Sequence, residues 1–196
     1  MKRLLLLLPL TVAICALAAS AAADTYKIDP VHSSIRFKVR HFFSYVEGSF
    51  TKFDGTIQFD PEQPEKSSVT ATIDVASVDT HNDKRDADLR SDHFFDVAKY
   101  PAITFKSKNV KQTGADSADI VGDLTMHGVT KEITLRAKFL GKGKGMGGKL
   151  ISGWQITPES IKRSDYGLTW NKAVEGTAVV GEEVTIAIDA EADKTP

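Results

Sequence analysis

The sequence predicts an all-β protein, an antiparallel barrel of about eight strands with one short helix between strands. Two observations predict this fold. Apolar and polar residues alternate along much of the chain, as in strands that have one buried and one solvated face. Short stretches of turn-forming residues separate these segments, which favours antiparallel pairing. Because nearly every segment keeps one apolar face, we prefer a closed barrel to a sandwich.

The alternating segments form a strong group and a weak group. Alternation is regular in Ile35–Val39, Val69–Val75, Ile133–Phe139 and Val184–Ala190. It is weaker in Thr56–Phe59, Ala102–Val110, Ile120–Met126 and Leu150–Ile156. The predicted hairpin turns are Asp54-Gly55, His127-Gly128 and Gly141–Gly148, and Asp60–Pro64 is a longer turn.

Two places have helical patterns. Thr80 begins a capping-box pattern with Asp83 three residues later, which predicts a helix that ends near Leu89 or Arg90. Pro158–Ile161 is predicted to form a second, single helical turn.

The beginning of the chain has the composition of a secretory signal peptide. Lys2 and Arg3 precede an apolar run, Leu4–Ala19, and the small residues Ser20–Ala23 offer a cleavage site. We therefore expect a signal peptide at 1–23 and one exported barrel domain at 24–196. The only cysteine, Cys15, would leave with the signal peptide, so the mature domain would contain no disulfide.

Charge and hydropathy exclude two classes of partner. The chain has 25 Lys and Arg residues and 26 Asp and Glu residues, so its formal net charge is −1. No basic field is present to attract nucleic acid or an anionic membrane. No second apolar run follows the signal peptide, and we expect no membrane span.

The motifs of metal, nucleotide and covalent chemistry lack their required context. Gly143–Lys149 has the spacing of a phosphate loop, but Leu150 replaces the Ser or Thr of that motif and a strand follows. The histidines lie too far apart for metal-ligand pairs, and the acidic residues between Asp83 and Asp96 lack the Gly and Glu of a calcium loop. Since no G-x-S-x-G motif occurs either, we expect no metal, no cofactor and no enzyme activity.

Small residues occupy several inward-facing positions of the predicted barrel, namely Ala71, Ser107, Gly122, Ala137 and Ser152. A barrel of about eight strands either is filled by its own side chains or holds one ligand. Small inward residues favour a cavity, whereas large neighbours such as Phe59 and Trp154 would fill the same space. The sequence leaves both alternatives open.

Aromatic residues gather near the predicted strand ends, in His41-Phe42-Phe43, Phe94-Phe95 and Asp165–Trp170. One interpretation is that these side chains fill the two ends of the barrel as ordinary core residues. With the charged residues beside them, they would equally form an apolar mouth whose polar groups orient the head of a ligand.

Motifs spread over the whole predicted mature chain carry a family resemblance. They are D-P-V-H-S at 29–33, Gly48–Gly55, Arg85–Phe105, Gly122–Lys131 and Ile161–Gly167. In this order they resemble the YceI family of exported polyisoprenoid-binding proteins. One departure is Tyr166, which stands where the family more often has Phe.

The resemblance implies an extended, lipocalin-like, eight-stranded antiparallel barrel in the periplasm, and in some members a homodimer. Its implied function is to bind, store or transport a long-chain polyisoprenoid or a related amphiphile, such as an isoprenoid quinone or a prenyl phosphate, without a chemical step. Arg85–Asp96 would then cross one end of the barrel with its phenylalanines pointing inward.

Candidate ligand-binding residues follow from these patterns. The predicted lining and mouth consist of Phe37, Val39, Phe42, Phe50, Phe59, Ile73, Leu89, Phe94, Phe95, Phe105, Leu124, Leu135, Trp154, Tyr166 and Trp170. The candidate head-group residues are Arg40, His41, Arg85, Asp86, Arg90, Arg163 and Asp165.

Three alternatives accompany this hypothesis. The ligand would instead be a fatty acid or fatty amide. An enzyme acting on such lipids would need an acid or base in the pocket, for which His32, His41 and Asp165 are candidates. An interaction protein with a filled barrel would carry no lipid.

Overall fold

The computed structural model describes residues 23–158, 161–171, 173–174 and 177–196. The predicted signal peptide, 1–23, lies outside these residues except for Ala23. Within the described ranges, no helix has both the length and the apolar character needed to cross a membrane.

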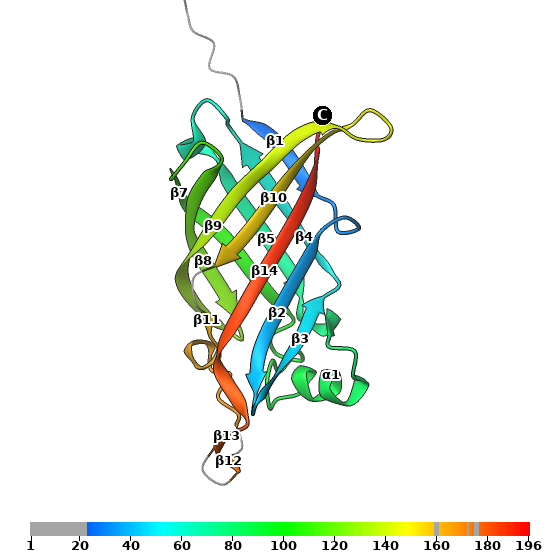
Figure 1. Cartoon of the computed structure of the whole chain (residues 1–196), viewed down its shortest axis with the longest axis vertical. Coiled ribbons are helices and arrows are strands. Elements are labelled where there is room, and N and C mark those ends of the chain that lie inside the picture. The colour runs from blue at the N-terminus through cyan, green and yellow to red at the C-terminus, as the bar shows by residue number, and fades with distance from the viewer. Residues whose placement is uncertain (1–22, 159–160, 172, 175–176) are drawn as a thin grey trace, which may run out of the picture.

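Long β-strands make up most of the described chain (Figure 1). They are β1 (Asp24–Ile28), β2 (Ser34–His41), β3 (Ser44–Phe50), β4 (Phe53–Phe59), β5 (Ser68–Asp74), β7 (Ala102–Gln112), β8 (Ser117–Met126), β9 (Val129–Lys144), β10 (Leu150–Pro158) and β14 (Val180–Lys194). Short strands are β6 (Val78–Asp79), β11 (Ile161–Lys162), β12 (Ala173–Val174) and β13 (Thr177–Ala178). The helical elements are α1 (Asp83–Arg90) and the 3-10 turns η1 (Pro64–Lys66), η2 (Val75–Ser77) and η3 (Arg163–Tyr166).

The strands close into an eight-stranded antiparallel barrel, which confirms the predicted fold class. The barrel follows the order β1-β4-β5-β7-β8-β9-β10-β14, and β14 pairs with β1 to complete it. One end of the barrel carries α1 and the β12–β13 hairpin, and we call it the helix end (Figure 1). The other, the loop end, carries the β4–β5, β7–β8 and β9–β10 connections.

Strand β14 is long enough to pair with two strands on one of its sides. Its last residues pair with β1, where Tyr26 faces Lys194, and its first half pairs with β2, where Ile35 faces Ile188. The predicted strands included β2 but missed β1, because the five residues of β1 are too few to reveal an alternation. Strand β3 was also missed, and it extends the sheet from β2 to β6.

Alternation along the strands places apolar side chains inside the barrel. Ile103 and Phe105 of β7 and Leu124 and Met126 of β8 are buried, while the polar residues between them on each strand are more exposed. Strand β9 departs from this rule at one point. Phe139 pairs with Trp154 and Gly141 with Gly153, so Leu140 is an extra residue that forms a β-bulge.

The predicted turns have mixed outcomes. The His127-Gly128 hairpin is confirmed, and both residues have positive φ angles, 51° and 74°, as a tight hairpin requires. The Asp54-Gly55 turn is wrong, because both residues lie within β4. A Cβ atom at Gly55 would come within 2.7 Å of the Thr70 carbonyl oxygen, so the glycine there allows two strands to approach closely. Of Gly141–Gly148, the first four residues belong to β9.

The predicted helix exists and ends at Arg90, but its capping residue was wrong. Asn82 is the N-cap, and its side-chain oxygen accepts a hydrogen bond from the backbone N–H of Arg85 at 3.0 Å. Thr80 precedes the helix and is instead bonded to Arg85 and Asp86. The predicted turn at Pro158–Ile161 includes residues 159–160, which lie outside the described residues; Pro158 ends β10 and Ile161 begins β11.

Candidate ligand-binding site

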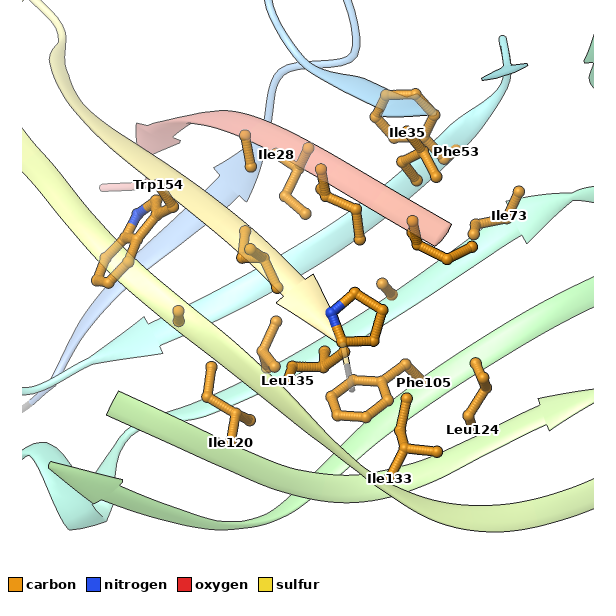
Figure 2. Close-up of a pocket in the computed structure, with 18 of the residues that line it drawn as sticks. Ile28, Ile35, Phe53, Ile73, Phe105, Ile120, Leu124, Ile133, Leu135 and Trp154 are labelled. Atoms are coloured by element: carbon orange, nitrogen blue, oxygen red, sulfur yellow. The ribbon is translucent and has the colours of Figure 1, made fainter. Parts of the chain in front are cut away.

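An apolar cavity of about 510 Å³ lies inside the barrel. Every barrel strand contributes to it, for example Ile28 from β1, Phe53 from β4 and Trp154 from β10 (Figure 2). The volume falls in the range of roughly 300–1,000 Å³ that small-molecule sites occupy. The lining residues of β9 extend from Ile133 to Lys142, which is about 30 Å of strand and about 23 Å along a barrel axis tilted by ~40°. The interior is therefore long, narrow and not filled by its own side chains.

Two of the small inward residues account for part of this space. Ala71 and Ala137 line the cavity. The other three have structural roles. The Ser107 hydroxyl accepts a hydrogen bond from the backbone N–H of Val69, and Gly122 leaves room for the Phe105 ring. Ser152 is fully buried, and its hydroxyl accepts the indole N–H of Trp154.

Most of the predicted lining residues surround the cavity. They are Phe37, Val39, Phe50, Phe59, Ile73, Leu89, Phe94, Phe95, Phe105, Leu124, Leu135 and Trp154. Residues of the same inward faces that were not selected also line it, among them Ile28, Ile35, Phe53, Ile57, Val69, Ile103, Ile120, Met126, Ile133, Phe139, Ile156, Ile186 and Ile188. The alternation that predicted the strands could have identified most of these residues.

The segment that follows α1 closes the helix end of the cavity. The backbone N–H of Phe95 donates to the Leu89 carbonyl at 3.0 Å, which folds the chain back under the helix. Leu89, Phe94 and Phe95 line the cavity, and the ring of Phe95 meets that of Phe50 edge to face, with 6.0 Å between centroids.

Three predicted lining residues do not line the cavity. Phe42 lies in the β2–β3 turn, where its ring contacts those of its sequence neighbours His41 and Phe43. Trp170 packs outside Phe94, with ring centroids 5.1 Å apart. Tyr166 is buried in the apolar core, and only 2% of its surface is exposed. Alternation cannot place these residues because they lie in turns and not in strands.

Arg85 and Arg90, predicted to bind a head group, are engaged in holding α1 against the chain before it. Arg85 donates to the Thr80 carbonyl at 2.8 Å, and Arg90 donates to the carbonyls of Ala76 at 2.8 Å and Val78 at 2.7 Å. The buried Asp86 carboxylate accepts the backbone N–H of Thr80 at 3.0 Å. None of the three lines the cavity, because these contacts turn them towards the backbone.

Arg163 does line the cavity, but its N–H groups bond to the protein. Nε donates to the Gly181 carbonyl at 2.9 Å, Nη1 donates to the Leu168 and Trp170 carbonyls, and Nη2 donates to the Val180 carbonyl and to a Glu182 carboxylate oxygen. These acceptors match the five N–H donors of a guanidinium group.

The remaining head-group candidates lie on the surface, away from the cavity. Asp165 forms an ion pair with Lys131 at 3.2 Å, and the exposed Arg40 donates to the Phe42 carbonyl at 2.8 Å. His41 is exposed at the end of β2.

The loop end of the cavity contains features that the sequence did not reveal. Phe59, Phe139 and Trp154 form an aromatic cluster there, with centroids 4.7–5.3 Å apart. The cavity lining beyond them includes the polar residues Gln112 and Asp116 and the cation Lys142. The only signal for Lys142 would have been the bulge at Leu140, which depends on the pairing partner and cannot be seen in one strand.

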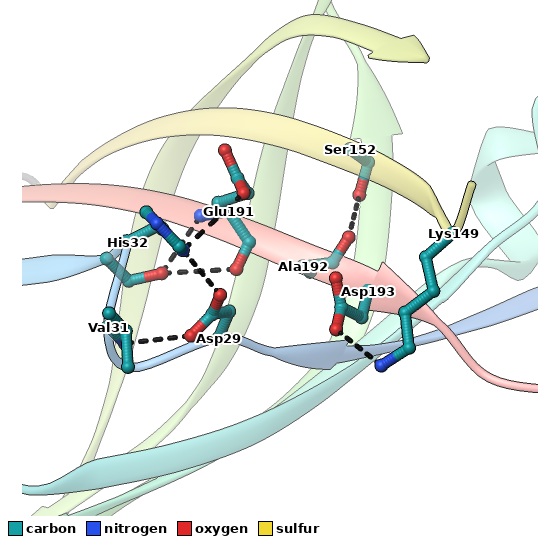
Figure 3. A network of polar contacts seen from close by, with 9 residues as sticks. Asp29, Val31, His32, Lys149, Ser152, Glu191, Ala192 and Asp193 are labelled. Carbon is teal, nitrogen blue, oxygen red and sulfur yellow. Dashed lines mark hydrogen bonds and ion pairs between the residues drawn. The ribbon is translucent and has the colours of Figure 1, made fainter. Parts of the chain in front are cut away.

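A polar cluster joins the β1–β2 connection to β14 on the outside of the barrel (Figure 3). His32 Nδ1 lies 2.7 Å from a carboxylate oxygen of Asp29 and 3.9 Å from one of Glu191. The Ser33 hydroxyl exchanges hydrogen bonds with the backbone of Glu191, donating to its carbonyl and accepting from its N–H. These three side chains, Asp29, His32 and Glu191, have ligand atoms within 4.8 Å of one another. Neither His32, 63% exposed at its side chain, nor the other two residues line the cavity.

The family model of the YceI-like domain matches residues 26–192. The chain belongs to the YceI family. This confirms the resemblance that the motifs indicated, and the match includes at least part of every long strand that builds the barrel.

Two bacterial relatives illustrate the place of the chain in the YceI family. Protein YceI of Escherichia coli O6:H1 is 43% identical over 154 residues, 77% of this chain and 80% of the relative. A UPF0312 protein of Pectobacterium atrosepticum is 41% identical over 187 residues, 93% of this chain and 95% of the relative.

Solved structures share the YceI fold. BcnA of Burkholderia cenocepacia superposes with a TM-score of 0.74 at 25% identity, covering 84% of this chain and 98% of BcnA. A domain of Saccharophagus degradans, described as a polyisoprenoid binding domain implicated in plant cell wall breakdown, superposes with a TM-score of 0.64. It covers 89% of this chain and all of that domain, and at 20% identity the likeness is one of fold.

Tyr166, the departure from the YceI pattern, provides a first prediction. Its buried hydroxyl has no hydrogen-bond partner among the described residues, and burial raises its pKa to about 12. Replacing it by Phe is expected to increase the free energy of unfolding by about 1 kcal/mol, because an unsatisfied buried hydroxyl is removed. Urea denaturation measures this change. Tyr26→Phe is the matched control, since the Tyr26 hydroxyl has Asp24 as partner and its loss brings no gain.

The pH dependence of Tyr166 has a defined sign. The folded state raises its pKa above the ordinary value of 10, so the neutral phenol is favoured by folding. The associated stability is fully present below pH 10 and is lost as the pH rises towards 12. Tyr166→Phe should lack this loss. A stability decrease of more than about 1 kcal/mol in that variant would show that the hydroxyl has a partner.

His32 provides a second prediction. The hydrogen bond and charge of Asp29 raise the pKa of His32 above 6.5. The associated stability is fully present below pH 6.5 and is lost as the pH rises through the folded-state pKa. An NMR titration of the His32 ring should show the raised pKa in the native chain and a return towards 6.5 in Asp29→Asn. An unchanged pKa in that variant would assign the shift to Glu191 instead.

Proposed function

We propose that this chain binds a long-chain polyisoprenoid or a related amphiphilic lipid, such as an isoprenoid quinone or a prenyl phosphate, inside its barrel. It would store or carry the lipid without a chemical step. The observation that carries the proposal is the long cavity of about 510 Å³, to which every barrel strand contributes apolar side chains. Such a space suits a flexible apolar chain better than a compact polar molecule.

Simple energetics support a lipid with a long tail. Burying hydrocarbon gains roughly 0.8 kcal/mol per CH₂ group. About ten buried carbons then correspond to micromolar affinity before the costs of association are counted. Because every part of the tail contributes alike, the barrel should discriminate poorly between tails, and selectivity must come from the head group.

The family supports the same proposal. The S. degradans domain with this fold is described as polyisoprenoid binding. The sequence at 1–23 has the pattern of an export signal, so we propose the periplasm as the location. The homodimer implied by the family resemblance is tested by light scattering of the purified protein.

The alternatives differ in what the cavity offers them. A fatty acid or fatty amide would fit the same apolar space, and only its identification separates it from an isoprenoid. For an enzyme, the proposed acids and bases His32, His41 and Asp165 all lie outside the cavity lining. A filled barrel is at odds with the cavity volume.

The test is mass spectrometry of an organic extract of the protein, exported and purified under mild conditions from its native host. We expect about one long-chain lipid per chain, with an isoprenoid tail. A fatty acid or amide would replace the isoprenoid in the proposal. An extract without lipid, also after incubation with added prenyl lipids, would overturn it.

A further inference from the structure

We propose that the loop end of the cavity holds the ligand head group and that the Lys142 ammonium binds an anionic group there, a phosphate or a carboxylate. This inference rests on the proposed function and names the polar chemistry of its ligand. It moves the head group to the end of the barrel opposite the arginines that the sequence suggested.

The two cations of the cavity lining differ in whether their hydrogen-bond donors are available to a ligand. Two cationic side chains, Arg163 and Lys142, belong to the described lining of the cavity. Arg163 donates its N–H groups to four backbone carbonyls and to the Glu182 carboxylate. For Lys142, the described part of the chain supplies neither a hydrogen bond nor an ion pair. Lys142 is therefore the lining cation whose donors are available to a ligand.

The β-bulge in β9 determines the direction of the Lys142 side chain. Without a bulge, residues of odd number on β9 would face inward, as Leu135, Ala137 and Phe139 do. The extra residue at Leu140 shifts this pattern by one, so Lys142 pairs with Ser152 and shares its face of the sheet. Ser152 is fully buried, and its hydroxyl accepts the Trp154 indole N–H at 3.1 Å. The bulge thus turns Lys142, an exposed residue, to the face of β9 that lines the cavity.

Carboxylates at the loop end could compete with a ligand anion for Lys142. Asp24, whose pKa Lys142 helps to lower, is already paired with Lys194 at 2.6 Å. Asp116 is the carboxylate that the cavity lining contributes at this end. Since Asp24 already has Lys194 as its partner, Lys142 can serve a ligand anion.

The test compares matched probes that differ only in the head group. Farnesyl phosphate is compared with farnesol, and oleate with oleyl alcohol, using tryptophan fluorescence, to which Trp154 of the cavity lining and Trp170 contribute. We expect each anion to bind about tenfold more tightly than its alcohol, as one charge-assisted hydrogen bond provides. Lys142→Gln should abolish this preference by weakening the binding of the anions more than that of the alcohols. Whichever anion shows the larger Lys142-dependent preference identifies the phosphate or the carboxylate as the natural group.

Two controls make the result specific. Lys138→Gln removes a charge from the outer face of the same strand and should leave the preference intact. Deleting Leu140 removes the bulge but leaves Lys142 opposite Ser152 on the inward face, so a folded deletion variant should keep the preference.

Three outcomes have different meanings. An unchanged anion preference in Lys142→Gln overturns this inference and leaves the proposed function intact. Equal affinity of the native chain for the anions and the alcohols also overturns this inference and leaves the proposed function intact. Binding of none of the probes by the native chain overturns the proposed function, and this inference with it.

Discussion

Replacing Arg163 with Met is expected to lower the free energy of unfolding by about 3–5 kcal/mol. The side chain is only 5% exposed and ties together three segments: η3, which contains it, Leu168–Trp170 and the start of β14. Methionine fills a similar volume but leaves the carbonyls of Leu168, Trp170 and Gly181 without these donors in a buried place. Each unsatisfied carbonyl lowers stability by about 1–3 kcal/mol.

Urea denaturation of Arg163→Met and Arg36→Met at one temperature checks this prediction. Arg36 pairs with Asp189 on the outside of the barrel, and 57% of its side chain is exposed, so its loss should change stability by about 0–1 kcal/mol. Arg163→Lys should lose most of the stability as well, because an ammonium group cannot reproduce the planar arrangement of donors. Equal effects at positions 163 and 36 would contradict a structural role for Arg163.

Replacing Ala137 with Trp is expected to reduce the lipid that copurifies with the chain to about one tenth or less. Ala137 is 5% exposed, lines the cavity and faces Ala118 on the neighbouring strand, so the indole would extend into the space proposed for the tail. Added bulk in a packed core lowers stability by about 1–3 kcal/mol, but here it enters an existing cavity, and the fold should persist.

Mass spectrometry of extracts measures the lipid content of Ala137→Trp, and circular dichroism establishes that the variant is folded. Lys138→Trp is the matched control, because it adds the same side chain one residue along the strand on the exposed face. Its lipid content should equal that of the native chain. A folded Ala137→Trp variant with native lipid content would place the ligand outside the cavity.

The regular parts of the barrel were predictable because they depend on local pattern. Ile35, Phe37 and Val39 alternate with polar neighbours, and this alternation alone fixes which side chains point inward. The short strand β1 lacks enough residues for such a pattern, and it joins the sheet because β4 and β14 provide partners on both of its sides.

The polar part of the site was not predictable because it depends on contacts between distant segments. Arg85, Arg90 and Arg163 have the residue type that favours a phosphate, yet backbone carbonyls already occupy their donors. Lys142 lies in a Gly-rich stretch without a regular pattern, and only its pairing with β10 reverses the direction of its side chain. The composition of a rim therefore says less about ligand contacts than the hydrogen bonds that its residues already make.

The pairing between β1 and β14 has a consequence for how the chain acquires its structure. Tyr26 and Lys194 are paired although 168 positions separate them in sequence, so the barrel can close only when both ends of the chain are present. Such distant contacts slow folding. A chain whose second end is not yet available would keep two strand edges unpaired, and these edges invite association with other chains. The closing step should therefore set both the folding rate and the period in which a newly made chain needs protection.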